Sequence, residues 1–264
     1  MYNYIMEINN EYLISLTSIP RRLNNTTIKM VDYLKKQNFK CKILINIPYS
    51  YKKWGDYTLD ENIFSNDDLV EIYRPSKDYG AATKLIGALE YIKKFENKTI
   101  KYVITVDDDI YYKNFDWIDR LVDNGKKYKN CAITFGGIKL VKYPYKHKDG
   151  LKYKNVGSVD CPAGFKGVLY PISKFRENDI IYSFMNTLPD GIFNDDDAYF
   201  GIILSLMDIE LVAISQGRGG TESITDTGPS GVEENADNPR IINEMLIYQY
   251  AVKNELLPNK NKNY

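Results

Sequence analysis

Three aspartates stand side by side at residues 107–109, directly after the apolar run YVITV. Such a run predicts a buried strand of a parallel sheet, which places Asp107, Asp108 and Asp109 at its carboxyl end. Hard oxygen ligands without His or Cys favour Mg²⁺ or Mn²⁺, whose remaining positions are filled by water and phosphate. The D-x-D spacing therefore predicts a metal site on Asp107 and Asp109 that bridges to a nucleoside diphosphate. In the alternative reading, which stays open, the triplet caps a helix that starts near Asn114.

A second acidic triplet, Asp195, Asp196 and Asp197, opens an apolar stretch that predicts a helix over residues 195–207. A carboxylate across a cleft from a metal-bound leaving group can act as general base toward an attacking hydroxyl. Acidic residues at a helix start also suit the helix dipole, and for this motif alone that reading would win. Two triplets in one α/β domain favour the catalytic interpretation.

The segment SKDYGAATKLIGAL, residues 76–89, suggests an anion site. Gly80 and the alanines after it allow close approach of a ligand to a helix N-terminus, where backbone N–H groups favour phosphate. Lys84 would point from the first turn toward that phosphate. The plain alternative is a capped amphipathic helix with a solvent-exposed lysine, and it is equally favoured until the segment is paired with residues 107–109.

Further along, DCPAGFKGVLYP combines Gly164, Phe165 and Gly167, a pattern that suits a sugar ring against a glycine-lined backbone. A tight turn that enters an apolar strand explains the same residues almost as well. The lysine-rich tract at residues 139–154 could meet anionic lipid or phosphate, but a solvated loop is the favoured interpretation.

The elements that must position these residues alternate between strands and helices as far as residue 135. Strands are predicted at residues 12–19, 40–48, 69–75, 99–106, 131–137 and 209–215, and helices after Pro20 and over 81–96, 116–128, 195–207 and 239–257. This order predicts an α/β fold of the Rossmann-like kind, with a mostly parallel central sheet flanked by helices. Residues 136–160 are expected to be loop or hairpin, and the breaker-rich segment 216–238 is expected to be mobile. We expect one domain over 1–264, with a nucleotide-binding half (1–135) and an acceptor-binding half (136–264).

The composition of the chain limits which classes of partner, metal site and cellular location are expected. Lys+Arg and Asp+Glu number 35 each, so no net charge attracts nucleic acid. His147 is the only histidine, which disfavours His-rich metal sites and Ser-His-Asp catalysis. Three widely spaced cysteines suit free thiols in a reducing compartment.

Without a signal peptide or an apolar run near 18 residues, the expectation is a soluble, cytoplasmic protein, in the host cytoplasm if the source is viral. The lysine tract leaves peripheral membrane contact open.

Taken in order, these motifs resemble the GT-A glycosyltransferases (glycosyltransferase family 2-like), over about residues 11–215. LISLTSIPRRL is similar to the first strand and nucleotide-binding turn of that family, DYGAATKLIGAL to its donor-side segment, and VDDDI to its D-x-D position. DDAYFG is similar to the Glu-Asp-Val-x-x-Gly stretch of β-1,3-type members, and GFKGVLYP to the acceptor segment upstream of it. The family's C-terminal metal-binding histidine is missing, and Asp196 stands where the family has Glu.

The resemblance implies roles for individual residues. The metal would be bound by Asp107 and Asp109, and the acceptor by Gly164, Phe165 and Gly167. Asp197 would be the catalytic base, with Asp196 and Asp195 as alternatives. The residues implied to bind the donor are Thr17, Pro20, Arg21, Asp78, Gly80, Lys84, Asp107, Asp108 and Asp109.

The prediction is thus a metal-dependent (Mn²⁺ or Mg²⁺), inverting glycosyltransferase. It would move a sugar from a nucleoside diphosphate sugar, with a UDP-sugar favoured, to a hydroxyl on a glycan, lipid-linked or protein acceptor. The alternatives are an inactive nucleotide- or glycan-binding module on the same fold and, less favoured, a nucleotidyltransferase.

Overall fold

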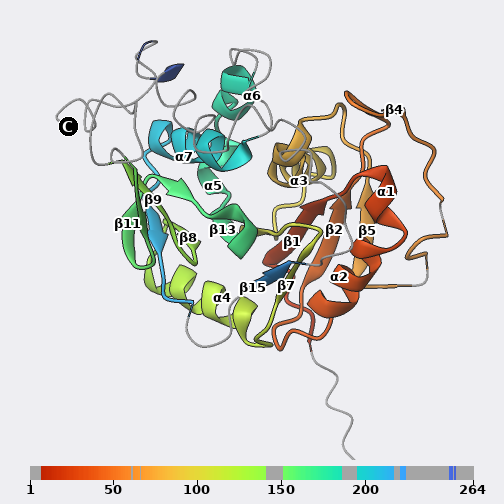
Figure 1. Cartoon of the computed structure of the whole chain (residues 1–264), viewed down its shortest axis with the longest axis horizontal. Coiled ribbons are helices and arrows are strands. Elements are labelled where there is room, and N and C mark those ends of the chain that lie inside the picture. Colours follow the sequence, from red (N-terminus) through yellow and green to blue (C-terminus); the bar gives the residue numbers. More distant parts are fainter. Residues whose placement is uncertain are drawn as a thin grey trace, which may run out of the picture.

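A computed structural model describes residues 7–60, 62–65, 67–140, 151–185, 195–216, 221–223, 250, 251 and 253 (Figure 1). The main strands are β1 (Tyr12–Thr17), β2 (Lys42–Asn46), β5 (Val70–Tyr73), β6 (Tyr102–Thr105), β8 (Ala132–Thr134), β11 (Gly157–Val159), β13 (Val168–Pro171) and β14 (Leu211–Ala213). They form one eight-stranded sheet in the order β11-β14-β8-β13-β6-β1-β2-β5.

The sheet is mixed but mostly parallel, as predicted. The neighbours β5–β2, β2–β1, β1–β6 and β8–β14 are parallel. Strand β13 runs antiparallel between β6 and β8, and β11 runs antiparallel to β14. Because β1, β2, β5 and β6 point the same way, their carboxyl ends meet at one edge of the sheet, which is where open α/β sheets bind ligands.

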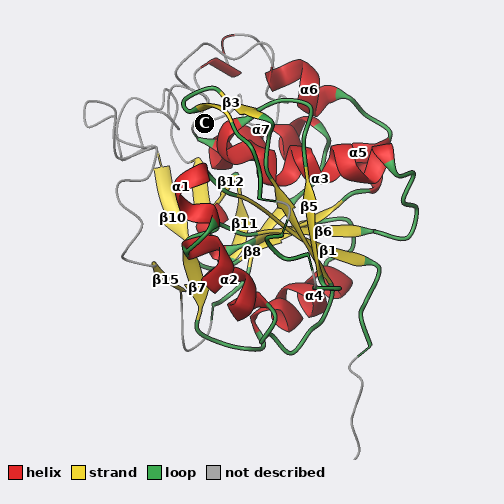
Figure 2. Cartoon of the chain, turned by 90° about the vertical axis from the view of Figure 1, so that its right-hand side faces the viewer, coloured by secondary structure: helices red, strands yellow, loops and turns green. Residues whose placement is uncertain are grey.

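Helices cover both faces of this sheet. Their bounds are α1 (Pro20–Leu23), α2 (Thr26–Leu34), the 3₁₀ turn η1 (Gly80–Ala82), α3 (Thr83–Lys94), α4 (Trp117–Lys127), α5 (Ser173–Arg176), α6 (Ile180–Met185) and α7 (Asp196–Leu206). Figure 1 shows α3, α5 and α7 above the sheet and α2 and α4 below it, and Figure 2 shows the same layers after a quarter turn.

Alternation along the central strands explains the two apolar cores. Leu13 and Leu44 pack into the cluster under α3 and α7, whereas Ile14 and Ile43 pack into the cluster with α2 and α4. Successive strand side chains point to opposite faces, so a strand that is apolar at every position is covered on both sides.

The single helix expected after Pro20 is two helices. α1 ends at Leu23 and α2 begins at Thr26, with Asn24 and Asn25 between them. Asn competes with the helix ladder by bonding nearby backbone, so an Asn pair is a natural break.

Short strands lie outside the main sheet: β3 (Ser50–Tyr51), β4 (Gly55–Asp56), β7 (Ile110–Tyr112), β9 (Gly137–Leu140), β10 (Leu151–Lys154), β12 (Cys161–Pro162) and β15 (Thr221–Ser223). β9 pairs with β10 as an antiparallel hairpin, within the region expected to be loop or hairpin. β15 pairs with β7, so part of the segment 216–238 lies against the strand that follows the first acidic triplet.

Several sequence expectations lie largely outside the described residues. Of the segment 216–238 only Gln216 and residues 221–223 are described, and of the C-terminal helix only residues 250, 251 and 253. The division into halves at residue 135 stays a prediction. Within the described part of the chain, no helix combines the length and the apolar character needed to cross a membrane.

Candidate active site

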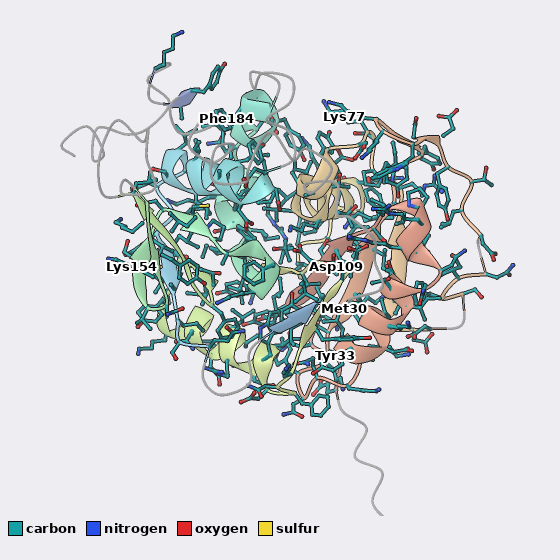
Figure 3. All side chains as sticks on the ribbon, in the orientation of Figure 1. Met30, Tyr33, Lys77, Asp109, Lys154 and Phe184 are labelled. Carbon is teal, nitrogen blue, oxygen red and sulfur yellow. The ribbon has the colours of Figure 1, made fainter. Side chains whose placement is uncertain are left out.

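The first triplet lies at the carboxyl edge of the sheet. Residues 107–109 connect β6 to β7, and the neighbouring strand β1 leads into Ser18 and α1 at the same edge. Figure 3 places Asp109 near the centre of the molecule. The three carboxylates differ in surroundings, because Asp108 and Asp109 lie in a turn between the two strands that points the side chains in different directions.

Asp108 points inward and anchors the loop after β1. Its carboxylate accepts a hydrogen bond from Ser18 Oγ at 2.6 Å and one from Arg22 Nη1 at 2.8 Å. Ser18 Oγ also lies 2.6 Å from Thr27 Oγ1. Burial raises the pKa of Asp108, and the Arg22 charge and the Ser18 hydroxyl act against that rise. Asp108 therefore holds the loop through its two partners, and a direct contact with nucleotide stays a prediction.

Asp107 and Asp109 are the more accessible members. Their side chains are 30% and 17% exposed, against 7% for Asp108. Asp109 Oδ2 lies 3.0 Å from Arg22 Nη2. Burial and the neighbouring Asp108 charge raise the pKa of Asp109 to about 6, more than Arg22 offsets. The charged form of this carboxylate is thus under-compensated at neutral pH.

The second triplet begins α7, as predicted. Asp195 is the N-cap, and its Oδ1 accepts from the Ala198 N–H at 3.4 Å. Both carboxylate oxygens of Asp197 lie 3.1 Å from the Gly164 N–H. All three aspartates are buried, and the N–H groups of Ala198 and Gly164 stabilise the charges of Asp195 and Asp197.

Lys84 joins the two triplets. Its Nζ lies 2.6 Å from Asp107 Oδ1 and 2.9 Å from Asp196 Oδ2, and the side chain is 5% exposed. Burial acts to lower the pKa of Lys84, but the charges of Asp107, Asp196 and Asp197 outweigh it and hold the pKa well above its usual value. The lysine is therefore a permanent cation between the two acidic clusters.

The donor-side segment before Lys84 is held by its own aspartate. Asp78 accepts from the Gly80 N–H at 2.8 Å and from the Lys52 N–H at 3.0 Å. Gly80 has φ +59, a conformation that favours glycine. Asp78 and Gly80 thus shape the turn into η1, and their contact with donor stays a prediction.

In the first turn the arginine beside the aspartates is Arg22, whereas the sequence prediction named Arg21. Arg22 is buried against Asp108 and Asp109, and Arg21 is exposed. Pro20 occupies the first turn of α1, and Thr17 Oγ1 donates to the Asn46 carbonyl at 2.9 Å. The sequence holds adjacent arginines but no signal for the orientation of so short a helix.

The expected acceptor segment lies against the second triplet. A Cβ on Gly164 would lie 2.0 Å from Asp197 Oδ1, so only glycine allows the hydrogen bond to form. The Phe165 carbonyl accepts from Tyr112 Oη at 3.3 Å. Gly167 has φ +84, and a Cβ there would lie 2.1 Å from the Trp117 ring. Gly164 thus has a contact within the site, and Gly167 has a packing reason of its own.

The residues at the sheet edge fit a divalent cation that shares phosphate oxygens. The described part of the chain holds no group of three His, Cys, Asp or Glu side chains arranged as a complete metal cage. Mg²⁺, however, is commonly bound by one or two carboxylates with substrate phosphate and water. Asp107 and Asp109 are the two more exposed carboxylates of the triplet, and they are the residues that would hold such a cation.

Comparison with known proteins rests on structure alone. No protein-family model matches the sequence, and no curated protein matches it. A mannosyltransferase from Pyrobaculum calidifontis, solved in complex with GDP-Man and Mn²⁺, superimposes with a TM-score of 0.51 at 11% identity. The match covers 94% of this chain and 72% of that chain. The chain has a GT-A-like fold.

Other solved structures match this GT-A-like chain less well. A 4-diphosphocytidyl-2C-methyl-D-erythritol synthase has a TM-score of 0.47 at 7% identity and covers 91% of this chain and 99% of its own. A CMP:2-keto-3-deoxy-manno-octonic acid synthetase complexed with CTP has a TM-score of 0.46 at 10% identity, with 78% and 89% covered. At these identities the likeness concerns the fold, and function must be argued from the site.

Proposed function

We propose that this GT-A-like protein is a metal-dependent, inverting glycosyltransferase that moves a sugar from a nucleoside diphosphate sugar to a hydroxyl acceptor. The observation that carries the proposal is the Lys84 bridge between Asp107 at the sheet edge and Asp196 at the start of α7. It brings a cluster suited to a leaving diphosphate next to a cluster suited to an incoming hydroxyl. The neighbour solved with GDP-Man and Mn²⁺ supports the choice of donor and metal.

On the donor side, Asp107 and Asp109 would hold the divalent cation, which supplies Lewis-acid neutralisation of the leaving diphosphate when bound. Lys84 and Arg22 add fixed positive charge at the same edge. Preorganised cations of this kind stabilise charge where it develops in the transition state. Asp108 keeps Arg22 in place through its 2.8 Å hydrogen bond.

On the acceptor side, Asp197 would take the proton from the acceptor hydroxyl. The bond between the anomeric carbon and the phosphate oxygen breaks, its electron pair leaves with the diphosphate, and the acceptor oxygen bonds to the opposite face of that carbon. The Gly164 N–H fixes the orientation of the Asp197 carboxylate at 3.1 Å. A well-placed base contributes about 10²–10⁴-fold. The acceptor would be a hydroxyl of a glycan, a lipid-linked or a protein substrate.

A panel of UDP- and GDP-sugars tests the proposal, first by thermal stabilisation with and without Mn²⁺ or Mg²⁺. A ligand that binds only the folded state at about 100 times its Kd raises stability by about 2.7 kcal/mol. Donors that stabilise the protein are then incubated with mixed acceptors, and free nucleoside diphosphate and glycosylated product are measured by mass spectrometry. Asp109→Asn serves as the matched variant, because it keeps the side-chain shape and removes the charge.

The expected result is metal-dependent stabilisation and transfer in the wild type, with both lost in Asp109→Asn. Stabilisation by a nucleotide sugar or glycan with no turnover would instead support the binding-module alternative. Release of pyrophosphate from a nucleoside triphosphate and a sugar phosphate would indicate a nucleotidyltransferase. Full transfer by Asp109→Asn with unchanged metal dependence would overturn the metal assignment.

A further inference from the structure

A chain of polar contacts lies buried beneath Lys84, in an otherwise apolar interface between α3 and the sheet. Ser15 Oγ on β1 donates to the Lys84 carbonyl at 2.5 Å. Asn46, the last residue of β2, donates through Nδ2 to Ser15 Oγ and to the Leu16 carbonyl, each at 2.8 Å. Ser15 and Asn46 are both fully buried.

Gly87 completes this contact from the helix side. A Cβ at Gly87 would lie 2.4 Å from Asn46 Oδ1, so α3 can approach β2 this closely only because the residue is glycine. Gly87 lies one helical turn after Lys84. The polar side chains and the glycine therefore meet at the turn that carries the cation of the site.

Gly87 and Asn46 are not the residues that stability alone would favour at these positions. Glycine in a helix interior is unfavourable relative to alanine. Asn46 Oδ1 is buried and accepts no hydrogen bond within the described residues, and such a group is costly. Around them the interface is apolar, with Leu85, Ile86 and Leu89 packed against the sheet. Buried polar contacts of this kind are best attested as devices that fix one register of packing.

We infer that Ser15 and Asn46 are positioning residues that fix the register of α3 on the sheet and thereby hold the Lys84 ammonium between Asp107 and Asp196. A slip by one residue would move the helix by about 1.5 Å along its axis and turn it by about 100°. Lys84 Nζ would then leave both carboxylates, which it contacts at 2.6 and 2.9 Å. The placement of the ammonium is independent of any reaction, whereas its consequence for transfer rests on the proposed function.

The test compares Ser15→Thr with Ser15→Val, which have the same shape and differ only in the hydroxyl. Lys84 is buried and ion-paired, so acetylation by an N-hydroxysuccinimide ester under native conditions, followed by peptide mass spectrometry, should be slow. Ser15→Val is expected to raise the acetylation rate of Lys84 about tenfold relative to Ser15→Thr, the factor that corresponds to one lost hydrogen bond at a buried group. Ile86→Val, an apolar change in the same helix, controls for a general loss of stability.

A second variant covers the case in which Ser15→Val does not fold. Gly87→Ala keeps the residue types of Ser15, Asn46 and Lys84 but pushes α3, which carries Lys84, away from Asn46 Oδ1. It is expected to raise Lys84 acetylation as Ser15→Val does. Equal labelling of Lys84 in these variants and in Ile86→Val, at matched loss of Tm, would overturn the inference.

The kinetic readout separates this inference from the proposed function. If the proposed function holds, Ser15→Val should lower kcat about tenfold with little change in KM for the donor, whereas Ser15→Thr, which retains the hydroxyl, should keep a kcat close to that of the wild type. If Lys84 labelling rises in the Ser15→Val variant but the wild-type protein neither binds nor transfers a nucleotide sugar, the positioning role is supported and the proposed function is contradicted. If Ser15→Val and Ser15→Thr transfer the sugar equally fast, the positioning role in catalysis is contradicted and the proposed function is retained.

Discussion

The two acidic triplets have the same composition and are stabilised by different means. Residues 107–109 follow a strand, and cationic side chains reach them: Arg22 contacts Asp108 and Asp109, and Lys84 contacts Asp107. Residues 195–197 begin a helix, and backbone N–H groups of Ala198 and Gly164 bind Asp195 and Asp197. The start of α7 supplies the Ala198 N–H and a favourable dipole, and the Gly164 N–H adds a donor from another segment. Cationic side chains supply the contacts of the strand-end triplet, and Lys84 extends this cationic contact to Asp196.

This difference suggests a division of labour. In the strand-end triplet, burial first and the neighbouring Asp108 charge second raise the pKa of Asp109, and the proposed divalent cation would offset both. In the helix-start triplet, backbone N–H groups orient Asp195 and Asp197, which suits the proposed role of Asp197 as a base that keeps one orientation. Lys84 belongs to both clusters, so its removal is the strongest way to break the comparison.

Lys84→Met should have the largest effect, because it leaves Asp107 and Asp196 without the ammonium they share. Removing one partner of a buried ion pair costs about 3–5 kcal/mol. Urea denaturation measures the loss. Lys101→Met is the matched control, since the Lys101–Glu11 pair is largely exposed and should contribute about 0–1 kcal/mol. Similar losses in the two variants would show that the bridge is not structurally important.

Asp197→Asn should separate chemistry from stability in the helix-start triplet. The amide oxygen can still accept from the Gly164 N–H, so Tm should change little, whereas a missing base lowers kcat by about 10²–10⁴-fold. Asp195→Asn, which keeps the N-cap, should retain more activity. If Asp195→Asn or Asp196→Asn instead gave the larger loss, the base would have to be reassigned within the triplet.

Asp109→Asn should stabilise the metal-free protein at neutral pH. The folded-state pKa of about 6 lies above the ordinary value of 3.8, so the folded state binds the proton more tightly than the unfolded state, and stability falls as pH rises through this window. The amide removes this penalty, worth on the order of 1–3 kcal/mol above pH ~6.5. Thermal melts from pH 4 to 8 should show the gain shrinking toward pH 4; a constant gain, or a loss, would contradict the raised pKa.

The smallest effect concerns the cap of α7. Asp195→Ala removes the side-chain oxygen that accepts from the Ala198 N–H, and loss of an N-cap typically costs about 1 kcal/mol. Asp195→Asn retains an acceptor and should cost only a few tenths. Chemical denaturation of the two variants checks the difference; equal stabilities would mean that the carboxylate charge, and not the cap, stabilises this helix end.

Much of the architecture could be predicted from periodicity. The apolar run before Asp107 predicts a central strand, which is β6 in the structure. The small residues before Lys84 predict a helix start at the same sheet edge, and α3 begins at Thr83. What periodicity does not resolve is the break at Asn24, because one helix and two short helices bury similar apolar faces. Nor does periodicity resolve which side chain of α1 contacts Asp108 and Asp109, which in the structure is that of Arg22.

Asp78 and Gly167 illustrate a second limit. Both stand in motifs that suggest ligand contact, and both have a sufficient local reason in the fold: Asp78 binds the Gly80 N–H, and Gly167 makes room for the Trp117 ring. A motif names residue types, but it does not say whether a side chain is used by the chain itself or presented to a ligand.

The sequence by itself determined the alternation of strands and helices, the side of the sheet on which the first triplet ends, and the helix that the second triplet begins. These follow from local propensity and from period, which each segment carries within itself. Only the tertiary structure decided that Lys84 would stand between Asp107 and Asp196, and that Ser15, Asn46 and Gly87 would meet beneath it. Those contacts join residues that are far apart in the chain, and they depend on sub-ångström fits between elements that no single segment encodes.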